Sequence, residues 1–197
     1  MYLALILATA LGLGMRHATD PDHVLAISTL VSRRGSPWRA SGIGVLWGAG
    51  HMATILLVGG AIVAFNVTLP PRANDAFEGC VALMLIALGA RSLLASRRAR
   101  GAPRFASPFA VGVVHGLAGS AAAALMIVPL IHDGVRATLY LVVFGIGTIL
   151  GMTLLTCAIA GSTMYVTRRV RGLDRWIGLG AGAMSVSFGA LLLYRIN

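Results

Sequence analysis

Six long apolar segments, separated by short polar gaps, constrain the fold of this chain more than any other feature. They span roughly residues 2–31, 41–66, 76–95, 107–131, 137–160 and 173–195. Each is about long enough to cross the ~30 Å hydrocarbon core of a bilayer as an α-helix. Helices satisfy their own backbone hydrogen bonds, which lipid cannot do for them. The sequence therefore predicts an all-α, polytopic membrane protein with six transmembrane helices in a single membrane domain, residues 1–197.

The overall composition agrees with a membrane protein and argues against a nucleic-acid partner. Hydrophobic residues make up 57% of the chain and charged residues only 11%, which is too apolar for an ordinary soluble domain. The net charge is +10, but aromatic residues are few and are not interleaved with the basic ones. We therefore expect the lipid bilayer as a partner and no nucleic acid.

The arginines are distributed unevenly among the gaps. The first, third and fifth gaps carry Arg33, Arg34, Arg39, Arg97, Arg98, Arg100, Arg104, Arg168, Arg169, Arg171 and Arg175. The other side has only Arg72, Arg136 and the tail residue Arg195. By the positive-inside rule, the three basic gaps face the cytoplasm and both termini lie outside a cytoplasmic membrane. The first segment is interpreted as a mature helix rather than a signal peptide, because no basic region precedes its apolar part.

Short motifs recur in the two halves of the chain at a nearly constant distance. The pairs are Gly14–His17 with Gly112–His115, Gly48–His51 with Gly145–Thr148, and Leu88–Ala90 with Phe188–Ala190, at offsets of 98, 97 and 100 residues. Three helices per half place the second half in the membrane in the opposite orientation, as in many secondary transporters. We therefore predict two inverted three-helix repeats, 1–98 and 99–197, against the alternative of chance matches among small residues.

A charged cluster interrupts the first apolar segment at residues 16–23, with the sequence Arg-His-Ala-Thr-Asp-Pro-Asp-His. Ionisable groups at membrane depth are costly and usually mark a functional site. Imidazoles and carboxylates are also common ligands of divalent transition metals. Pro21 cannot donate a backbone hydrogen bond to the carbonyl of His17, so we predict that the helix breaks inside the cluster. The fourth helix is a second candidate for such a break. The alternative is a set of internal ion pairs, for example Arg16 with Asp20.

Two further histidines in apolar segments extend this candidate site. His51 follows Gly50 in the second segment, and His115 occupies the repeat position of His17. The candidate metal ligands are therefore His17, Asp22, His23, His51 and His115. Candidates for supporting the ligands or for metal access are Arg16, Asp20, Thr54, Ser120 and Asp133. For Asp133, in the outer fourth gap, a solvated loop residue is the first interpretation and an access role the second.

The spacing of the first cluster resembles a known family signature. His17-x4-Asp22-His23 is similar to the His-x4-Asp-His motif of the nickel/cobalt transporter family, and Gly50-His51 in the next helix also resembles that family. The resemblance implies nickel or cobalt transport, with His17, Asp22 and His23 essential and His51 contributing.

The chain departs from the larger members of that family in two places. Those members carry an extra helix ahead of the motif and an acidic motif in their fifth helix. Here the motif lies in the first segment, and residues 115–120 read His-Gly-Leu-Ala-Gly-Ser. This pattern resembles the short, urease-accessory-like branch of the superfamily, which implies a link to a nickel enzyme such as urease.

We therefore predict a permease for Ni²⁺ or Co²⁺, with the metal as transported substrate and no tightly bound cofactor. Inward movement of a divalent ion gains about 4.6 kcal/mol per 100 mV, so uptake needs no ATPase domain. No phosphate-binding loop is present in the sequence. The first alternative is an exporter driven by proton antiport. A homo-oligomer is a further expected partner.

A membrane enzyme is the lower alternative, either a metallohydrolase or a thiol electron carrier. The sequence has no His-Glu-x-x-His motif. Its two cysteines, Cys80 and Cys157, lie in separate apolar segments without the close spacing of a redox pair. We therefore expect buried structural thiols and no enzyme activity.

Overall fold

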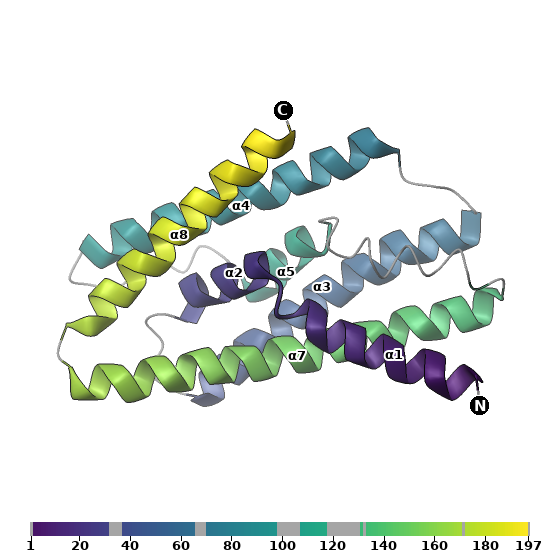
Figure 1. The fold of residues 1–197 in the computed structure, drawn as a ribbon, viewed down its shortest axis with the longest axis horizontal. Helices are drawn as coiled ribbons and strands as arrows, with labels where there is room; N and C mark the ends of the chain where they lie inside the picture. Colours follow the sequence, from purple (N-terminus) through teal and green to yellow (C-terminus); the bar gives the residue numbers. More distant parts are fainter. Residues whose placement is uncertain are drawn as a thin grey trace.

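The computed structural model describes residues 2–31, 37–65, 70–97, 107–117, 131, 133–170 and 172–196. Within these ranges the regular structure is entirely helical (Figure 1). The helices are α1 (Tyr2–His17), α2 (Pro21–Val31), α3 (Pro37–Phe65), α4 (Pro71–Arg97), α5 (Pro108–Gly116), α7 (Gly134–Arg169) and α8 (Leu173–Ile196). The predicted all-α class is confirmed for this part of the chain.

Four of these helices are long and apolar enough to cross a membrane. They contain the stretches Trp38–Phe65, Arg72–Ala95, Gly134–Arg169 and Leu173–Ile196, and they coincide with the second, third, fifth and sixth predicted segments. The first predicted segment is divided between α1 and α2, and each half is shorter than a membrane span. The fourth predicted segment begins with α5, but residues 118–130 lie outside the described ranges.

Prolines fix the start of several helices. Pro21, Pro37, Pro71 and Pro108 are each the first residue of a helix. Proline is favoured there because its missing N–H would have no partner in the first turn. Helix α7 begins differently, with the Asp133 carboxylate accepting hydrogen bonds from two backbone amides of the first turn.

The predicted break in the first segment is confirmed. Helix α1 ends at His17 and α2 begins at Pro21. In between, the amide of Asp20 donates to the carbonyl of His17 at 3.1 Å, and the amide of Val24 donates to the carbonyl of Asp20 at 3.0 Å. A proline has no N–H that could donate a hydrogen bond to the carbonyl of His17. This carbonyl accepts its hydrogen bond within a tight turn instead.

Helix pairs form the frame around this break. Helix α1 packs on α7, α5 packs on α3, and α4 packs on α8, while α3 also packs on α7. Helix α2 lies in the middle and contacts α4, α7 and α8 (Figure 1). Buried apolar side chains of α2, including Leu25, Ile27 and Val31, belong to the larger core cluster. The turn between α1 and α2 is thus held at the centre of the protein.

Glycines bring helix backbones together at several crossings, two of which lie at the centre of the protein. A Cβ atom on Gly14 of α1 would collide with the carbonyl of Phe144 in α7, and one on Gly112 of α5 would collide with the carbonyl of Trp47 in α3. Small residues at helix crossings allow this close approach in membranes.

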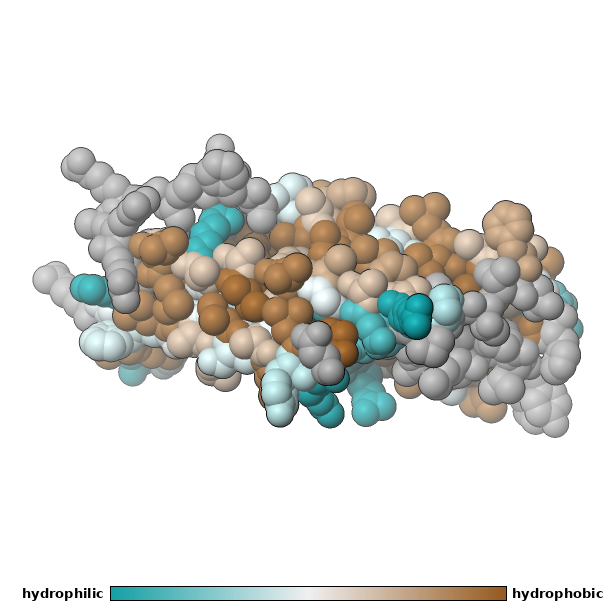
Figure 2. Space-filling model, turned by 90° about the horizontal axis from the view of Figure 1, so that it is seen from above, coloured by the Kyte–Doolittle hydropathy of each residue, from teal (hydrophilic) through white to brown (hydrophobic). Residues whose placement is uncertain are grey.

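The outer surface of the bundle is largely apolar. Figure 2 shows broad brown areas on the visible face, with hydrophilic residues confined to limited patches. Exposed large hydrophobic residues occur on several long helices, among them Leu57, Leu83, Leu154 and Met184. A surface of this kind suits lipid rather than water. Together with the four long apolar helices, it indicates a membrane protein.

Candidate metal site

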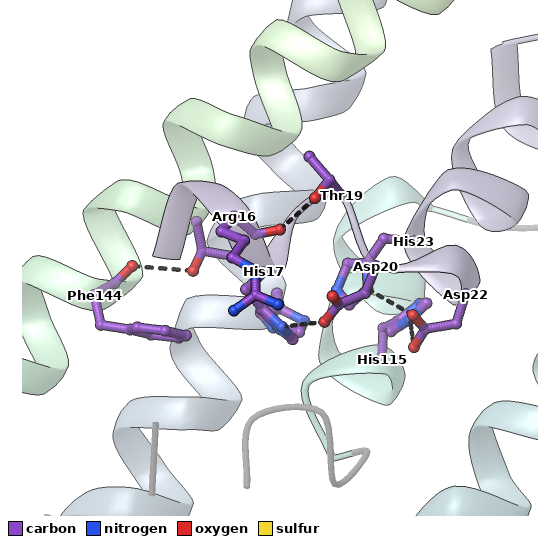
Figure 3. A network of polar contacts seen from close by, with 10 residues as sticks. Arg16, His17, Thr19, Asp20, Asp22, His23, His115 and Phe144 are labelled. Atoms are coloured by element: carbon purple, nitrogen blue, oxygen red, sulfur yellow. Dashed lines mark hydrogen bonds and ion pairs between the residues drawn. The ribbon is translucent and has the colours of Figure 1, made fainter. Parts of the chain in front are cut away.

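Four helices bring the predicted ligands together at the centre of the fold. His17 ends α1, Asp22 and His23 begin α2, His51 lies in the middle of α3, and His115 lies in the last turn of α5. The four histidines are buried, with His17 6% exposed and the other three 0% exposed. The break at Pro21 lets residues of α1 and α2 face the same centre (Figure 3).

On one side of the site, His17 joins α1 to α3. Its Nε2 lies 3.0 Å from Nε2 of His51, and its Nδ1 lies 2.8 Å from a carboxylate oxygen of Asp20. When a carboxylate accepts a hydrogen bond from Nδ1–H, it fixes the orientation of the imidazole ring. The lone pair available to a metal is then on Nε2. This pairing suits His17 for binding a metal through Nε2, supported by Asp20.

On the other side, Asp22 joins α2 to α5. One of its carboxylate oxygens lies 3.0 Å from Nδ1 of His23, and the other lies 2.9 Å from Nε2 of His115 (Figure 3). The Asp22 side chain is 13% exposed. It therefore brings one negative charge close to two buried imidazoles.

Several nitrogen atoms in the site have no hydrogen-bond partner although they are buried. These are Nε2 of His23, Nδ1 of His51 and Nδ1 of His115. Unsatisfied buried polar atoms are uncommon and call for an explanation. A bound cation would supply a partner for lone pairs of this kind.

The donor atoms fall into two groups with metal-like spacing. Those of His17, His23 and His51 lie within 4.8 Å of one another, and so do those of Asp22, His23 and His115. Nitrogen and carboxylate donors of this type suit nickel, cobalt, zinc or copper. The residues present therefore fit a divalent transition-metal ion.

Two aromatic residues that sequence reasoning missed flank the imidazoles. The ring centroid of Trp47 lies 5.4 Å from that of His23 and 5.6 Å from that of His115. The ring centroid of Phe144 lies 5.7 Å from that of His17. Both are buried. They line the imidazole cluster with aromatic ring surface. A signal existed, because Trp47 and Phe144 differ by the same 97 positions as the recurring glycine motifs of their helices.

The other predicted residues have different surroundings. Arg16 is exposed, and the carboxylate of Asp20 pairs with His17. Thr54 donates to the carbonyl of Val113 at 3.0 Å and thereby links α3 to α5. Asp133 is exposed, caps α7 and pairs with Arg136. Ser120 lies outside the described residues.

The fold and the site together define a class: a helical membrane protein whose centre holds a cluster of imidazole and carboxylate side chains that could bind a metal ion. No family model matches the chain, and no solved structure matches it. The chain is 31% identical over 211 residues to the urease accessory protein UreH of Bacillus sp. (strain TB-90), covering 98% of this chain and 92% of that protein. The chain belongs to the same family as UreH.

Proposed function

We propose that this chain is a permease that carries Ni²⁺ or Co²⁺ into the cell across the cytoplasmic membrane. The observation that carries the proposal is the cluster of His17, Asp22, His23, His51 and His115, contributed by four helices and buried inside an apolar bundle. Ionisable groups at membrane depth are energetically costly and usually mark a functional site. The membership in the UreH family supports nickel, since a permease of this kind would supply metal for urease.

The proposed architecture has six spans in two inverted repeats, with α1 and α2 together as the first span and α5 as the start of the fourth. The two glycine crossings support it. Gly14 contacts Phe144, and Gly112 contacts Trp47. Gly14 and Gly112 are 98 positions apart, and Trp47 and Phe144 are 97 positions apart, so the two contacts join equivalent residues of the two halves. In an inverted repeat, the substrate site lies near the midplane between the halves.

The third helix pair supports the same symmetry. A Cβ on Gly89 would lie 2.6 Å from the carbonyl of Gly182, and a Cβ on Gly189 would lie 2.6 Å from the carbonyl of Ala82. Each residue of the first contact is 100 positions from its counterpart in the second. The hydroxyl of Ser185 donates to the carbonyl of Leu85, again 100 positions away. Helices α4 and α8 therefore face each other through equivalent surfaces.

The orientation follows from the arginine distribution, with both termini outside and the basic ends of the helices in the cytoplasm. Helix α7 ends with Arg168 and Arg169 in its last turn, and this end is assigned to the cytoplasmic side. An inside-negative potential then favours inward movement of a divalent ion by about 4.6 kcal/mol per 100 mV. That energy supports about a thousandfold accumulation.

The side chains suggest how the site handles a hydrated ion. Neutral imidazoles replace water ligands, and the carboxylate of Asp22 offsets part of the positive charge. The Asp20 side chain is 39% exposed and bonds to His17, so it lies between solvent and the buried rings. We assign Asp20 to the access path.

Uptake of radioactive nickel tests this proposal. Cells expressing wild type, His23→Ala or an empty vector are compared, with Asp75→Asn as a control because Asp75 is an exposed carboxylate on α4. We expect accumulation above vector for wild type and Asp75→Asn, and vector level for His23→Ala. Accumulation below vector for wild type would show export instead. Equal accumulation in all strains, for both nickel and cobalt, would contradict the proposal.

A further inference from the structure

The donor atoms of the five candidate ligands fall into two overlapping groups rather than one. Ligand atoms lie about 2.0–2.2 Å from a transition-metal ion, so two ligands of one ion are at most about 4.4 Å apart. Two three-residue groups come close to this limit, with all donor atoms within 4.8 Å of one another. The first group is His17, His23 and His51, and the second is Asp22, His23 and His115. Among the described residues, the five together do not meet the same criterion.

His23 belongs to both groups and lies between them. Its ring centroid is 4.5 Å from that of His17 and 4.1 Å from that of His115. Its Nδ1 is bonded to Asp22, while its Nε2 is buried and has no partner. One ring nitrogen is thus held by the carboxylate of Asp22, and the other is available as a lone-pair donor. His51 and His115 are farther apart, with centroids 6.1 Å from each other.

The two groups differ in charge and in the carboxylate next to them. The first offers three neutral imidazoles and is linked through His17 to the half-exposed carboxylate of Asp20. The second contains the carboxylate of Asp22, which is 13% exposed, next to two histidines that are 0% exposed. An ion in the second position is therefore partly neutralised by a direct carboxylate ligand, whereas an ion in the first position has neutral ligands.

We propose that the transported ion has two adjacent positions that share His23, and that His23 hands the ion from one position to the other. The inference rests on the proposed transport function and specifies how that site works. The positions are occupied one at a time, because they share a ligand and because two divalent ions at this separation repel each other strongly. The substrate class is a divalent transition-metal ion that accepts both all-nitrogen and mixed nitrogen–oxygen ligand sets.

Binding of Co²⁺ to the purified full-length protein tests this inference, because the visible spectrum of Co²⁺ reports the number and type of its ligands. His51→Ala leaves the Asp22 position intact, and His115→Ala leaves the His17 position intact. We expect each variant to bind one Co²⁺ with a distinct spectrum and an affinity within about tenfold of wild type. His23→Ala removes a ligand from both positions and should weaken binding about 100-fold or more.

Transport by the same variants completes the test. Reconstituted in vesicles, His51→Ala and His115→Ala should both lose Co²⁺ uptake although they still bind the ion, and Asp75→Asn should keep it. His51→Gln and His115→Gln, which preserve side-chain volume, replace any alanine variant that does not fold.

A single shared shell would give a different pattern. If His51→Ala and His115→Ala lose Co²⁺ binding as severely as His23→Ala, or give one common spectrum, the two-position inference is overturned. Wild-type uptake in the same vesicles would then still support the proposed permease. Absence of wild-type uptake would overturn both.

Discussion

The two glycine crossings at the centre of the molecule have nearly the same backbone packing but different chemistry. At the α3–α5 crossing, a Cβ on Gly112 would approach the carbonyl of Trp47 and the amide of His51. At the α1–α7 crossing, a Cβ on Gly14 would approach the carbonyl of Phe144 and the amide of Thr148. Thr148 thus stands in α7 where His51 stands in α3.

The side chains at these equivalent positions have different partners. His51 directs Nε2 to within 3.0 Å of Nε2 of His17, on another helix. The hydroxyl of Thr148 donates to the carbonyl of Phe144 on its own helix, at 2.9 Å. At this equivalent position α3 therefore contributes a candidate ligand, whereas α7 contributes a side chain bonded within its own helix. The backbone frame and the ligand chemistry of this site are therefore separable, and different substitutions test each of them.

The largest expected effect comes from breaking the frame. Gly14→Val places side-chain atoms against the backbone of α7, which cannot move away without separating α1 from α7. Overpacking of this kind costs about 1–3 kcal/mol or more. We expect a strong loss of folded protein, measured by size-exclusion chromatography and thermal unfolding in detergent. Gly12→Val is the control on the same helix, because a Cβ there meets nothing within 4 Å. Equal behaviour of the two variants would contradict the packing account.

The next largest effect is expected from substituting the two equivalent residues at the crossings, His51 and Thr148. His51→Ala removes a donor from the cluster and should reduce nickel uptake about 100-fold, a loss typical of removing a metal-supporting group. Thr148→Ala removes a hydroxyl that is satisfied within its own helix, so uptake should change less than about threefold. Both variants are compared with wild type by initial rates of radioactive nickel uptake at equal membrane expression. Similar losses in the two variants would mean that Thr148 belongs to the site.

Strongly acidic pH should weaken metal binding by the histidine side of the comparison. Imidazoles bind metal only when neutral, and burial disfavours the charged imidazolium. Protons should therefore displace the metal only below the range in which an exposed histidine titrates, where affinity should fall about tenfold or more. Equilibrium binding of Co²⁺ to the purified protein at several pH values from about 7.5 down to about 4 measures this. An affinity that does not change over this whole range would argue against histidine ligands.

The smallest expected effect concerns a link between helices beside the site. Thr54→Val removes the hydrogen bond from Thr54 to the carbonyl of Val113, which joins α3 to α5. Hydrogen bonds between membrane helices contribute about 0.6 kcal/mol on average. The melting temperature should fall by about 1–3 °C, and metal binding should remain close to wild type. Loss of metal binding with unchanged melting would indicate that the hydroxyl contacts the metal.

Local chemistry in the sequence was sufficient to predict several features of this molecule. Apolar length predicted the four long helices, and Pro21 predicted the end of α1 and the start of α2. The types and spacing of His17, Asp22 and His23 predicted a candidate metal site at the break in the first segment.

Other features depend on how distant segments approach one another, which spacing alone does not determine. That Asp22 bonds both His23 and His115 follows from the turn geometry and from the position of α5. The contacts of Trp47 with the imidazoles require the glycine crossing that brings α3 and α5 together. The division of the ligands into two groups could be seen only in three dimensions.

X-ray absorption at the nickel edge, on the purified protein loaded with one Ni²⁺, shows directly whether imidazoles of the buried cluster bind the metal. Imidazole rings give characteristic outer-shell scattering beyond the first ligand shell, so bound histidine can be distinguished from water and carboxylate. The account predicts a shell that includes at least two imidazoles, and loss of this signal in His23→Ala. A shell of oxygen ligands without imidazole scattering, or a spectrum unchanged in His23→Ala, would contradict the claim that this buried cluster binds the metal.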